Sequence, residues 1–170
     1  QSFDVVPRHS SENPEVDELT TAGYEHYEIS NFCLPGLHSR HNSSYWTEKQ
    51  YLGCGPSAHS YNGISRQWNV ASLDKYIEGI SSGNPTFEVE ELDLYTRYND
   101  FVITHIRTQW GMPLPKLGKQ YGEELYKYCL RMATPYLQQG TLEIKNDTLK
   151  LTRKGVFISD GIMSDMLWVE

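Results

Sequence analysis

A short polar break, Ser81-Ser82-Gly83-Asn84-Pro85, divides this 170-residue chain into two parts of different character. Small polar residues broken by Gly and Pro are typical of linkers between domains. The part before the break holds short aromatic segments and closely spaced glycines, whereas the part after it holds long stretches with helical spacing. The sequence therefore predicts one unit over residues 1–80 and another over 88–170, joined by a linker at 81–87.

The first unit has the pattern of alternating helices and strands. An opening helix is expected to stop at Gly23, and the alternating aromatic segment Tyr24–Ile29 predicts a strand. A second strand-like piece covers residues 51–61. We expect a helix over Leu73–Ile80, with Ser72 as its N-cap. Such alternation suits a βα unit in an α/β sheet or barrel.

The second unit is predicted to be mostly helical. Apolar residues at helical spacing predict helices over residues 91–109, 115–121 and 125–137. Pro135 should kink the last of these. Alternating leucine and isoleucine on either side of Asn146-Asp147 indicate a two-stranded hairpin, and Thr152 can cap a final helix. Helices, a hairpin and a further helix describe a winged-helix-like module, so the whole chain is expected to be α+β, a fragment of an α/β protein.

The composition limits the classes of partner. The chain has 22% charged residues and a net charge of −7, which argues against a nucleic-acid surface, because phosphate binding needs a local excess of Lys and Arg. Four basic residues on the helices that would read DNA are better explained as a solvated face: Lys116, Lys119, Lys127 and Arg131. A DNA-binding winged helix fused to a ligand sensor stays an alternative. No run of roughly 18 apolar residues predicts a transmembrane helix.

The three cysteines, Cys33, Cys54 and Cys129, are widely spaced. An odd number at such spacing does not suggest a disulfide framework, and a reducing cytosol is the simpler interpretation. There is no C-x-x-x-C-x-x-C cluster to hold an iron–sulfur centre, so we expect no metal site within this chain. Cys54, between two glycines, is expected to be buried and inert rather than reactive.

Acid–base catalysis is a weak interpretation of the first strand. Glu28 and His26 share one face of such a strand while Glu25 points the other way. Groups of this kind are usually solvated or support a loop, so the sequence assigns no catalytic residue.

The segment His41-Asn42-Ser43-Ser44-Tyr45-Trp46 carries the most chemistry. We expect it to lie in a loop opened by Pro35-Gly36. A neutral imidazole is a good axial ligand for heme iron, a phenolate can be one, and an indole can stack on a porphyrin. The alternative is a polar loop with a packed indole and a hydrogen-bonded imidazole. His38, three residues earlier, competes with His41 as the ligand.

A second motif, Gly53-x-Gly55-x-x-Ala58, follows directly. A dinucleotide fingerprint would need a helix after it, and His59-Ser60-Tyr61 does not look like a helix opening. Two interpretations remain open, namely a backbone that approaches a cofactor closely and tight strand packing at a barrel edge.

These segments together resemble one known family. The segment Ala22–Phe32, Pro35-Gly36, the motif His41–Trp46 and the segment Tyr51–His59 all match, and Leu151–Gly155 resembles its closing motif. The chain is similar to the C-terminal portion of oxygen-independent coproporphyrinogen III oxidase-like radical SAM proteins, and within them to the HemW-type heme chaperone branch. The H-N-x-x-Y-W motif is the specific part, because it is associated with the chaperone branch and absent from the true oxidases.

The resemblance implies the last strands of a partial (β/α) radical SAM barrel followed by a C-terminal domain. It implies heme or porphyrin contacts at His41, Asn42, Tyr45, Trp46 and His38, and S-adenosylmethionine contacts at Gly53, Gly55, Ala58 and His59. The 4Fe–4S cysteines of the family are not among these 170 residues. Expected partners are heme and a heme-accepting protein in the cytoplasm, and a homodimer would cover an open strand edge. A true porphyrinogen-decarboxylating oxidase is the alternative.

Overall fold

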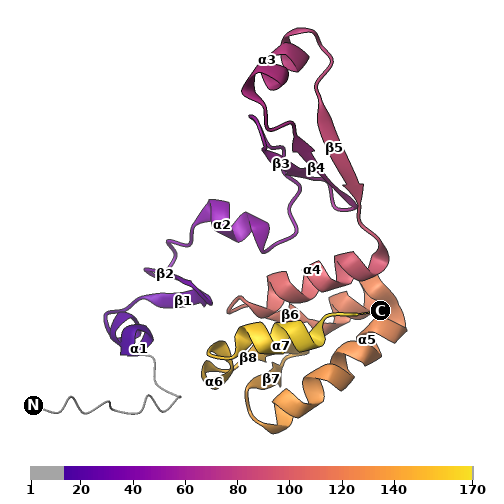
Figure 1. The fold of residues 1–170 in the computed structure, drawn as a ribbon. Helices are drawn as coiled ribbons and strands as arrows, with labels where there is room; N and C mark the ends of the chain where they lie inside the picture. The colour runs from indigo at the N-terminus through magenta and orange to yellow at the C-terminus, as the bar shows by residue number, and fades with distance from the viewer. Residues whose placement is uncertain (1–13, 170) are drawn as a thin grey trace, which may run out of the picture.

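The computed structural model of the chain describes residues 14–169. It has three parts: a short helix–hairpin–helix segment, an arm of strands that carries one helix, and a helical body that holds the C-terminus (Figure 1). Among the described residues, no helix combines the length and the apolar character that crossing a bilayer requires.

The N-terminal segment holds α1 (Pro14–Thr21), β1 (Glu25–Glu28), β2 (Asn31–Cys33) and α2 (Arg40–Tyr45). Gly23 follows α1 with a φ of +90°, a left-handed conformation that Gly adopts without steric cost. The predicted strand at residues 24–29 is confirmed as β1, which pairs antiparallel with β2.

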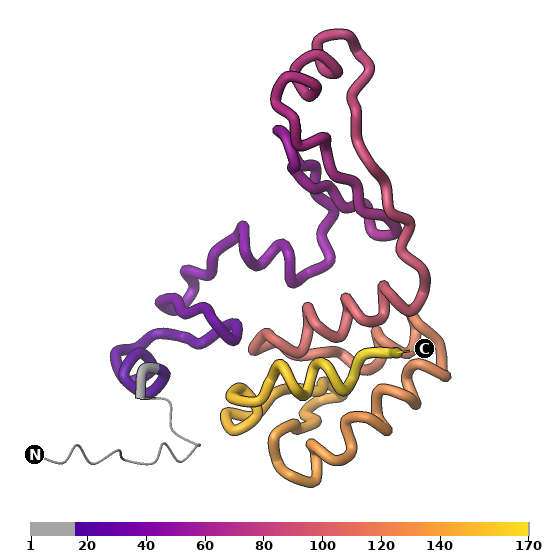
Figure 2. The backbone as a smooth tube through the Cα atoms, in the orientation of Figure 1, coloured from indigo at the N-terminus to yellow at the C-terminus, as the bar shows by residue number. Residues whose placement is uncertain are grey.

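The arm is built from β3 (His59–Tyr61), β4 (Ser65–Asn69), α3 (Leu73–Ser81) and β5 (Phe87–Glu91). Its strands form an antiparallel sheet in the order β3-β4-β5. The tube in Figure 2 follows the chain up the arm through β4, over α3 and back down through β5. Ser72 caps α3 as predicted, because its side chain accepts the N–H of Lys75.

The strand expected over residues 51–61 is wrong as a single element. Tyr51 instead pairs with Tyr61 through two backbone hydrogen bonds of 3.0 and 2.9 Å, so the segment folds back on itself. The two glycines and Pro56 between these tyrosines permit the reversal. The residues at 82–86 connect α3 to β5, and β5 continues the same sheet. The division of the chain into two domains stays a prediction.

The body contains α4 (Leu94–Ile106), β6 (Met112–Pro113), α5 (Leu114–Gln138), β7 (Leu142–Lys145), β8 (Thr148–Leu151), α6 (Arg153–Val156) and α7 (Ser159–Met166). Its core lies where α4, α5 and α7 meet the small sheet β6-β8-β7. Fully buried side chains there include Tyr98, Phe101, Leu117, Leu125 and Ile162. The predicted helices and hairpin are present, and the α+β class is confirmed.

The helices of the body match the prediction in part. The predicted helices at 115–121 and 125–137 are confirmed as the two parts of α5, which is kinked at Gly122, where φ is 84°, while the second part continues through Pro135 to Gln138. Thr152 caps only the short helix α6, and α7 follows separately. The hairpin turn at Asn146 and Asp147 has the positive φ angles, 50° and 56°, of a type I′ turn.

Candidate functional site

The His41–Trp46 motif lies on a short helix, α2, rather than in the loop that we expected. The side chain of Ser39 caps it by accepting the N–H of Asn42 at 3.2 Å. His41 and Tyr45 are one turn apart, and their rings meet edge to face with 5.1 Å between centroids. The Tyr45 hydroxyl lies 3.4 Å from Nε2 of His41. His41 is exposed, and the contact with Tyr45 on the same helix orients its ring.

Trp46, at the end of α2, faces the body. The guanidinium of Arg107 lies over its ring, 4.3 Å from the centroid. Its indole nitrogen Nε1 is buried and has no hydrogen-bond partner among the described residues, and the same holds for Oγ of Ser43. Buried donors are nearly always paired in native proteins, so this face is suited to a further group.

A cavity of about 270 Å³ opens between α2, the arm and α4. Half of the residues that line it are aromatic, namely Tyr45, Trp46, Tyr51, Tyr61 and Phe101, and four of the others are charged: Glu48, Arg66, Arg97 and Asp100. Burial is the main cause that raises the pKa of Tyr51 and of Tyr61, so both phenols are neutral at physiological pH. An ion pair between Arg66 and Asp100 lies in the same wall.

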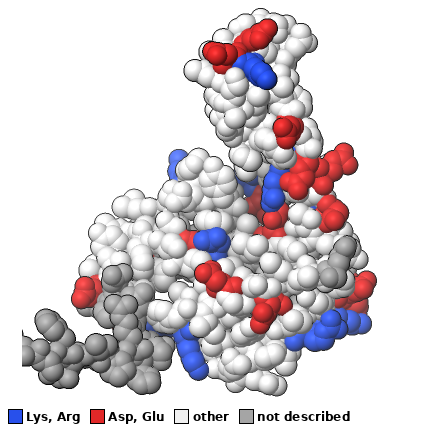
Figure 3. All heavy atoms as spheres, viewed as in Figure 1, with Lys and Arg blue, Asp and Glu red and all other residues white. Residues whose placement is uncertain are grey.

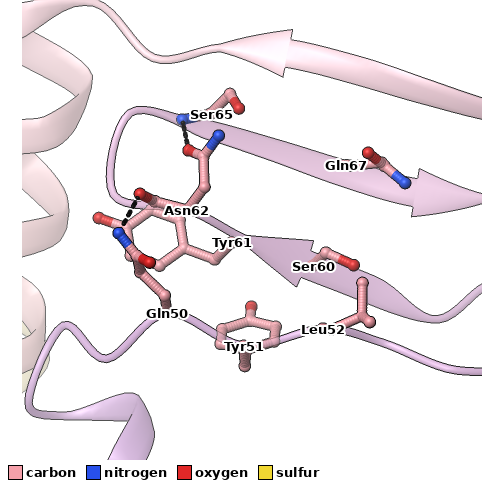
Figure 4. Close-up of a pocket in the computed structure, with 8 residues that line it drawn as sticks. All are labelled: Gln50, Tyr51, Leu52, Ser60, Tyr61, Asn62, Ser65 and Gln67. Carbon is pink, nitrogen blue, oxygen red and sulfur yellow. Dashed lines mark hydrogen bonds between the residues drawn. The ribbon is translucent and has the colours of Figure 1, made fainter.

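A second, polar pocket of about 410 Å³ lies on the arm (Figure 4). Gln50 donates from Nε2 to the carbonyl of Asn62 at 2.7 Å, and Oδ1 of Asn62 accepts the N–H of Ser65 at 2.7 Å. None of the residues that the sequence assigned to heme lines this pocket. Because several of its polar groups are satisfied within the chain, the aromatic cavity is the better candidate for a flat ligand.

The glycine motif forms a tightly packed loop. A Cβ on Gly53 would lie 2.1 Å from the carbonyl oxygen of His59, so only glycine fits there. The N–H groups of Gly53 and Gly55 donate to Oγ of Ser60 and the hydroxyl of Tyr76, each at 3.0 Å. These two amides are already bonded within the chain, which supports the packing interpretation for Gly53 and Gly55.

The strand β3 follows Ala58 directly, so the helix that a dinucleotide fingerprint requires is replaced by a strand. His59, the first residue of β3, is exposed and lies beside Trp68 with 5.9 Å between ring centroids. Its side chain remains available for a cofactor contact.

His38 lies in a different environment from His41. Its Nε2 is 2.9 Å from a carboxylate oxygen of Glu25, and its ring meets Tyr27 edge to face at 5.2 Å. The two competing imidazoles of the heme prediction thus face different neighbours.

Comparisons with known proteins show which family, sequences and fold this chain is similar to. Residues 92–158 match the family model of the HemN C-terminal domain. The heme chaperone HemW of Mycobacterium tuberculosis is 34% identical over 150 residues, which is 88% of this chain and 36% of that protein. The chain is therefore similar to the C-terminal portion of HemW-type radical SAM proteins.

Two further relatives show the extent of the match. HemW of Bacillus subtilis is 26% identical, over 89% of this chain and 40% of its own length. The chain thus spans about two fifths or less of the length of these curated relatives. A solved structure of coproporphyrinogen III oxidase (HemN) from Escherichia coli, a radical SAM enzyme, has a TM-score of 0.66 at 16% identity and covers 89% of this chain and 39% of its own. That likeness shows a shared fold.

The cysteines of this chain do not fit a 4Fe–4S cluster. Cys33 is buried in β2, Cys129 is buried in α5 and Cys54 is exposed in the arm. The expectation that Cys54 is buried is wrong, because the loop leaves its side chain exposed to solvent, whereas the neighbouring Gly53 packs against the backbone of His59. No step of cluster chemistry can be assigned to these residues.

Sequence reasoning missed the buried carboxylate of Glu28 and its partner Arg107. The side chain of Glu28 is completely buried and also accepts hydrogen bonds from the N–H of Ser30 and the side chain of Asn31. The close spacing of Glu28 and Asn31 could have indicated a turn. Arg107 carries no local signal, because it follows α4 and meets Glu28 only in the folded chain.

Proposed function

We propose that this chain is the part of a HemW-type heme chaperone that contacts heme or a porphyrin before its transfer to an accepting protein in the cytoplasm. The activity of the whole protein is part of the proposal, because the chain spans only part of its relatives. The observation that carries it is the placement of the motif: Tyr45 and Trp46 line an aromatic cavity, and the indole N–H of Trp46 is buried with no hydrogen-bond partner within residues 14–169. The relatives named heme chaperones support it.

The residues of the chain fit a heme by their chemistry. Heme supplies an iron that accepts an imidazole ligand and a flat apolar ring with carboxylate arms. The exposed ring of His41 is the first candidate ligand, with His38 as its competitor. Tyr45 and Trp46 offer aromatic surface, and Asn42 adds a polar group on the same helix. Arg97, in the wall of the cavity, would attract a carboxylate arm.

We further propose that the arm helps to close an S-adenosylmethionine site in the intact protein. The exposed His59 and the neighbouring loop Gly53–Ala58 are the groups we assign to that contact. The 4Fe–4S cluster would be held by residues outside this chain. A homodimer, which would cover an exposed strand edge, belongs to the same proposal.

Heme titration followed by the Soret band tests the heme proposal. We expect His41→Ala to weaken heme affinity at least about tenfold, which corresponds to about 1.4 kcal/mol. His59→Ala, an exposed histidine outside the motif, is the matched control and should leave the affinity unchanged. If His41→Ala and His38→Ala each bind heme as tightly as the unaltered chain, the ligand assignment is wrong.

The oxidase alternative draws support from the fold of the HemN neighbour alone. Coproporphyrinogen turnover by the reconstituted full-length protein distinguishes an oxidase from a heme chaperone: tight heme binding without turnover rejects the oxidase.

A DNA-binding role is disfavoured by the surface, because acidic side chains gather where the arm meets the body (Figure 3). There β5 carries Glu88, Glu90 and Glu91, which would repel phosphates.

A further inference from the structure

Three side chains of different chemistry converge beside the β1–β2 hairpin, outside the aromatic cavity. The carboxylate of Glu25, the thiol of Cys33 and the imidazole of His38 each place a ligand atom within 4.8 Å of the other two. Glu25 and Cys33 are direct partners across the antiparallel pair, so both side chains leave the same face of the hairpin. The loop through Pro35 and Gly36 returns the chain so that His38 lies over that face.

The surroundings hold this cluster in place. Cys33 is 9% exposed, and the ring of His38 is flanked by Tyr27 at 5.2 Å and Trp110 at 5.5 Å between centroids. The side-chain amide of Gln109 lies 3.3 Å from Nε2 of His38. The flanking aromatic rings limit the access of solvent to the three ligand atoms, as the apolar shell around a metal site does.

We propose that Glu25, Cys33 and His38 form a binding site for a zinc ion. A sulfur, a nitrogen and an oxygen are the donor types that zinc takes in proteins, at about 2.3 Å for sulfur and 2.0–2.2 Å for nitrogen and oxygen. Three protein ligands leave the fourth tetrahedral position open. Magnesium and calcium prefer oxygen ligands alone, so the thiol selects against them. The site departs from our expectation that this chain holds no metal.

A plain ion pair between His38 and Glu25 explains only two of the three groups. It gives no reason for a thiol to lie beside a carboxylate, where an anionic sulfur would be repelled. A divalent cation turns the same contact into an attraction and joins all three groups. The heme proposal shares His38 with this cluster as its competing ligand, but its first candidate ligand, His41, lies outside the cluster, so the two proposals can be tested separately.

Cobalt(II) is the probe, because it replaces zinc and gives a charge-transfer band in the near ultraviolet when a thiolate binds it. Titrating Co²⁺ into the reduced chain should produce this band, and Zn²⁺ should abolish it by displacement. Cys33→Ser should remove the band, whereas the matched control Cys54→Ser should keep it. Glu25→Gln and His38→Gln should each weaken Co²⁺ binding at least about tenfold.

The far-ultraviolet circular dichroism of each variant checks that it is folded. Absence of the band from the unaltered chain overturns the proposal. So does a band that survives in Cys33→Ser, or one that depends on Cys54. If Cys33→Ser loses the cobalt band but binds heme as tightly as the unaltered chain, the zinc site and the heme site are separate. The cobalt titration and the heme titration are independent measurements, so a negative result in one does not decide the other.

Discussion

Arg107 donates a hydrogen bond from Nε to Oε1 of Glu28 over 2.6 Å, and the side chain of Glu28 is completely buried. Glu28 ends β1, and Arg107 follows α4, so this ion pair joins the N-terminal hairpin to the body. The same guanidinium covers the ring of Trp46. One buried pair therefore connects the hairpin, the body and the end of the heme motif.

Removing one member of this pair should destabilise the chain strongly. Arg107→Met leaves the Glu28 carboxylate buried without a counter-charge, a change that typically costs about 3–5 kcal/mol. Glu28→Gln should also lower the free energy of unfolding, because it deprives Arg107 of its charged partner. Urea denaturation followed by circular dichroism measures the change.

The control for this prediction is an exposed ion pair. Glu123 and Lys127 lie 2.8 Å apart, one turn apart on α5, with side chains 78% and 70% exposed. Because exposed pairs contribute little, Glu123→Gln should leave the unfolding midpoint unchanged. A Glu28→Gln midpoint equal to that of Glu123→Gln would show that the buried pair does not hold the hairpin to the body.

Local patterns were sufficient to predict most of the body. Apolar spacing located α4, α5 and α7, and Asn146-Asp147 located the turn, because these signals lie within one turn or one hairpin. The fold-back of residues 51–61 was missed, because the pairing of Tyr51 with Tyr61 depends on a reversal by the loop between them. The two helices that apolar spacing predicts on either side of residue 122 are separated by Gly122, which has a positive φ that other residues avoid.

The site was only partly predictable for the same reason. The motif at 41–46 could be recognised as a linear segment, and its short helix follows from the Ser39 cap. The contact of Trp46 with Arg107, and the meeting of Cys33 with Glu25 and His38, depend on long-range or cross-strand placement. Sequence spacing alone does not reveal such contacts.

Gly155, in the closing segment Leu151–Gly155, should tolerate no side chain. A Cβ there would lie 1.9 Å from the backbone oxygen of Thr141, which cannot move without disturbing the start of β7. We expect Gly155→Ala to cost about 1–3 kcal/mol of unfolding free energy, as overpacking does. Gly161, on α7, has open space at its Cβ, so Gly161→Ala should be neutral or stabilising by up to about 1 kcal/mol. Equal midpoints in thermal unfolding would contradict this.

His105 should make stability fall in mild acid. Burial lowers the pKa of this ring, whose Nδ1 lies 2.9 Å from the carbonyl of Phe101. Below the ordinary value of about 6.5, the unfolded chain takes up a proton that the folded chain resists, so the free energy of unfolding decreases as pH falls. His105→Gln should flatten this part of the pH profile, whereas His59→Gln should preserve it. The denaturation midpoint of each variant is measured from pH 7.5 to about 5. If the midpoint falls equally steeply with pH in His105→Gln and His59→Gln, His105 is not the group responsible.

The three thiols should differ sharply in reactivity. Burial, followed by the charge of Glu25, raises the pKa of Cys33, and burial raises the pKa of Cys129 to about 12. Cys54 is exposed, and the thiolate is the reactive form of cysteine. An aromatic disulfide reagent at neutral pH should therefore label one thiol quickly in the native chain and all three in denaturant. Cys54→Ser should remove the fast phase, and a fast phase that persists in that variant would mean that Cys33 or Cys129 is open to solvent.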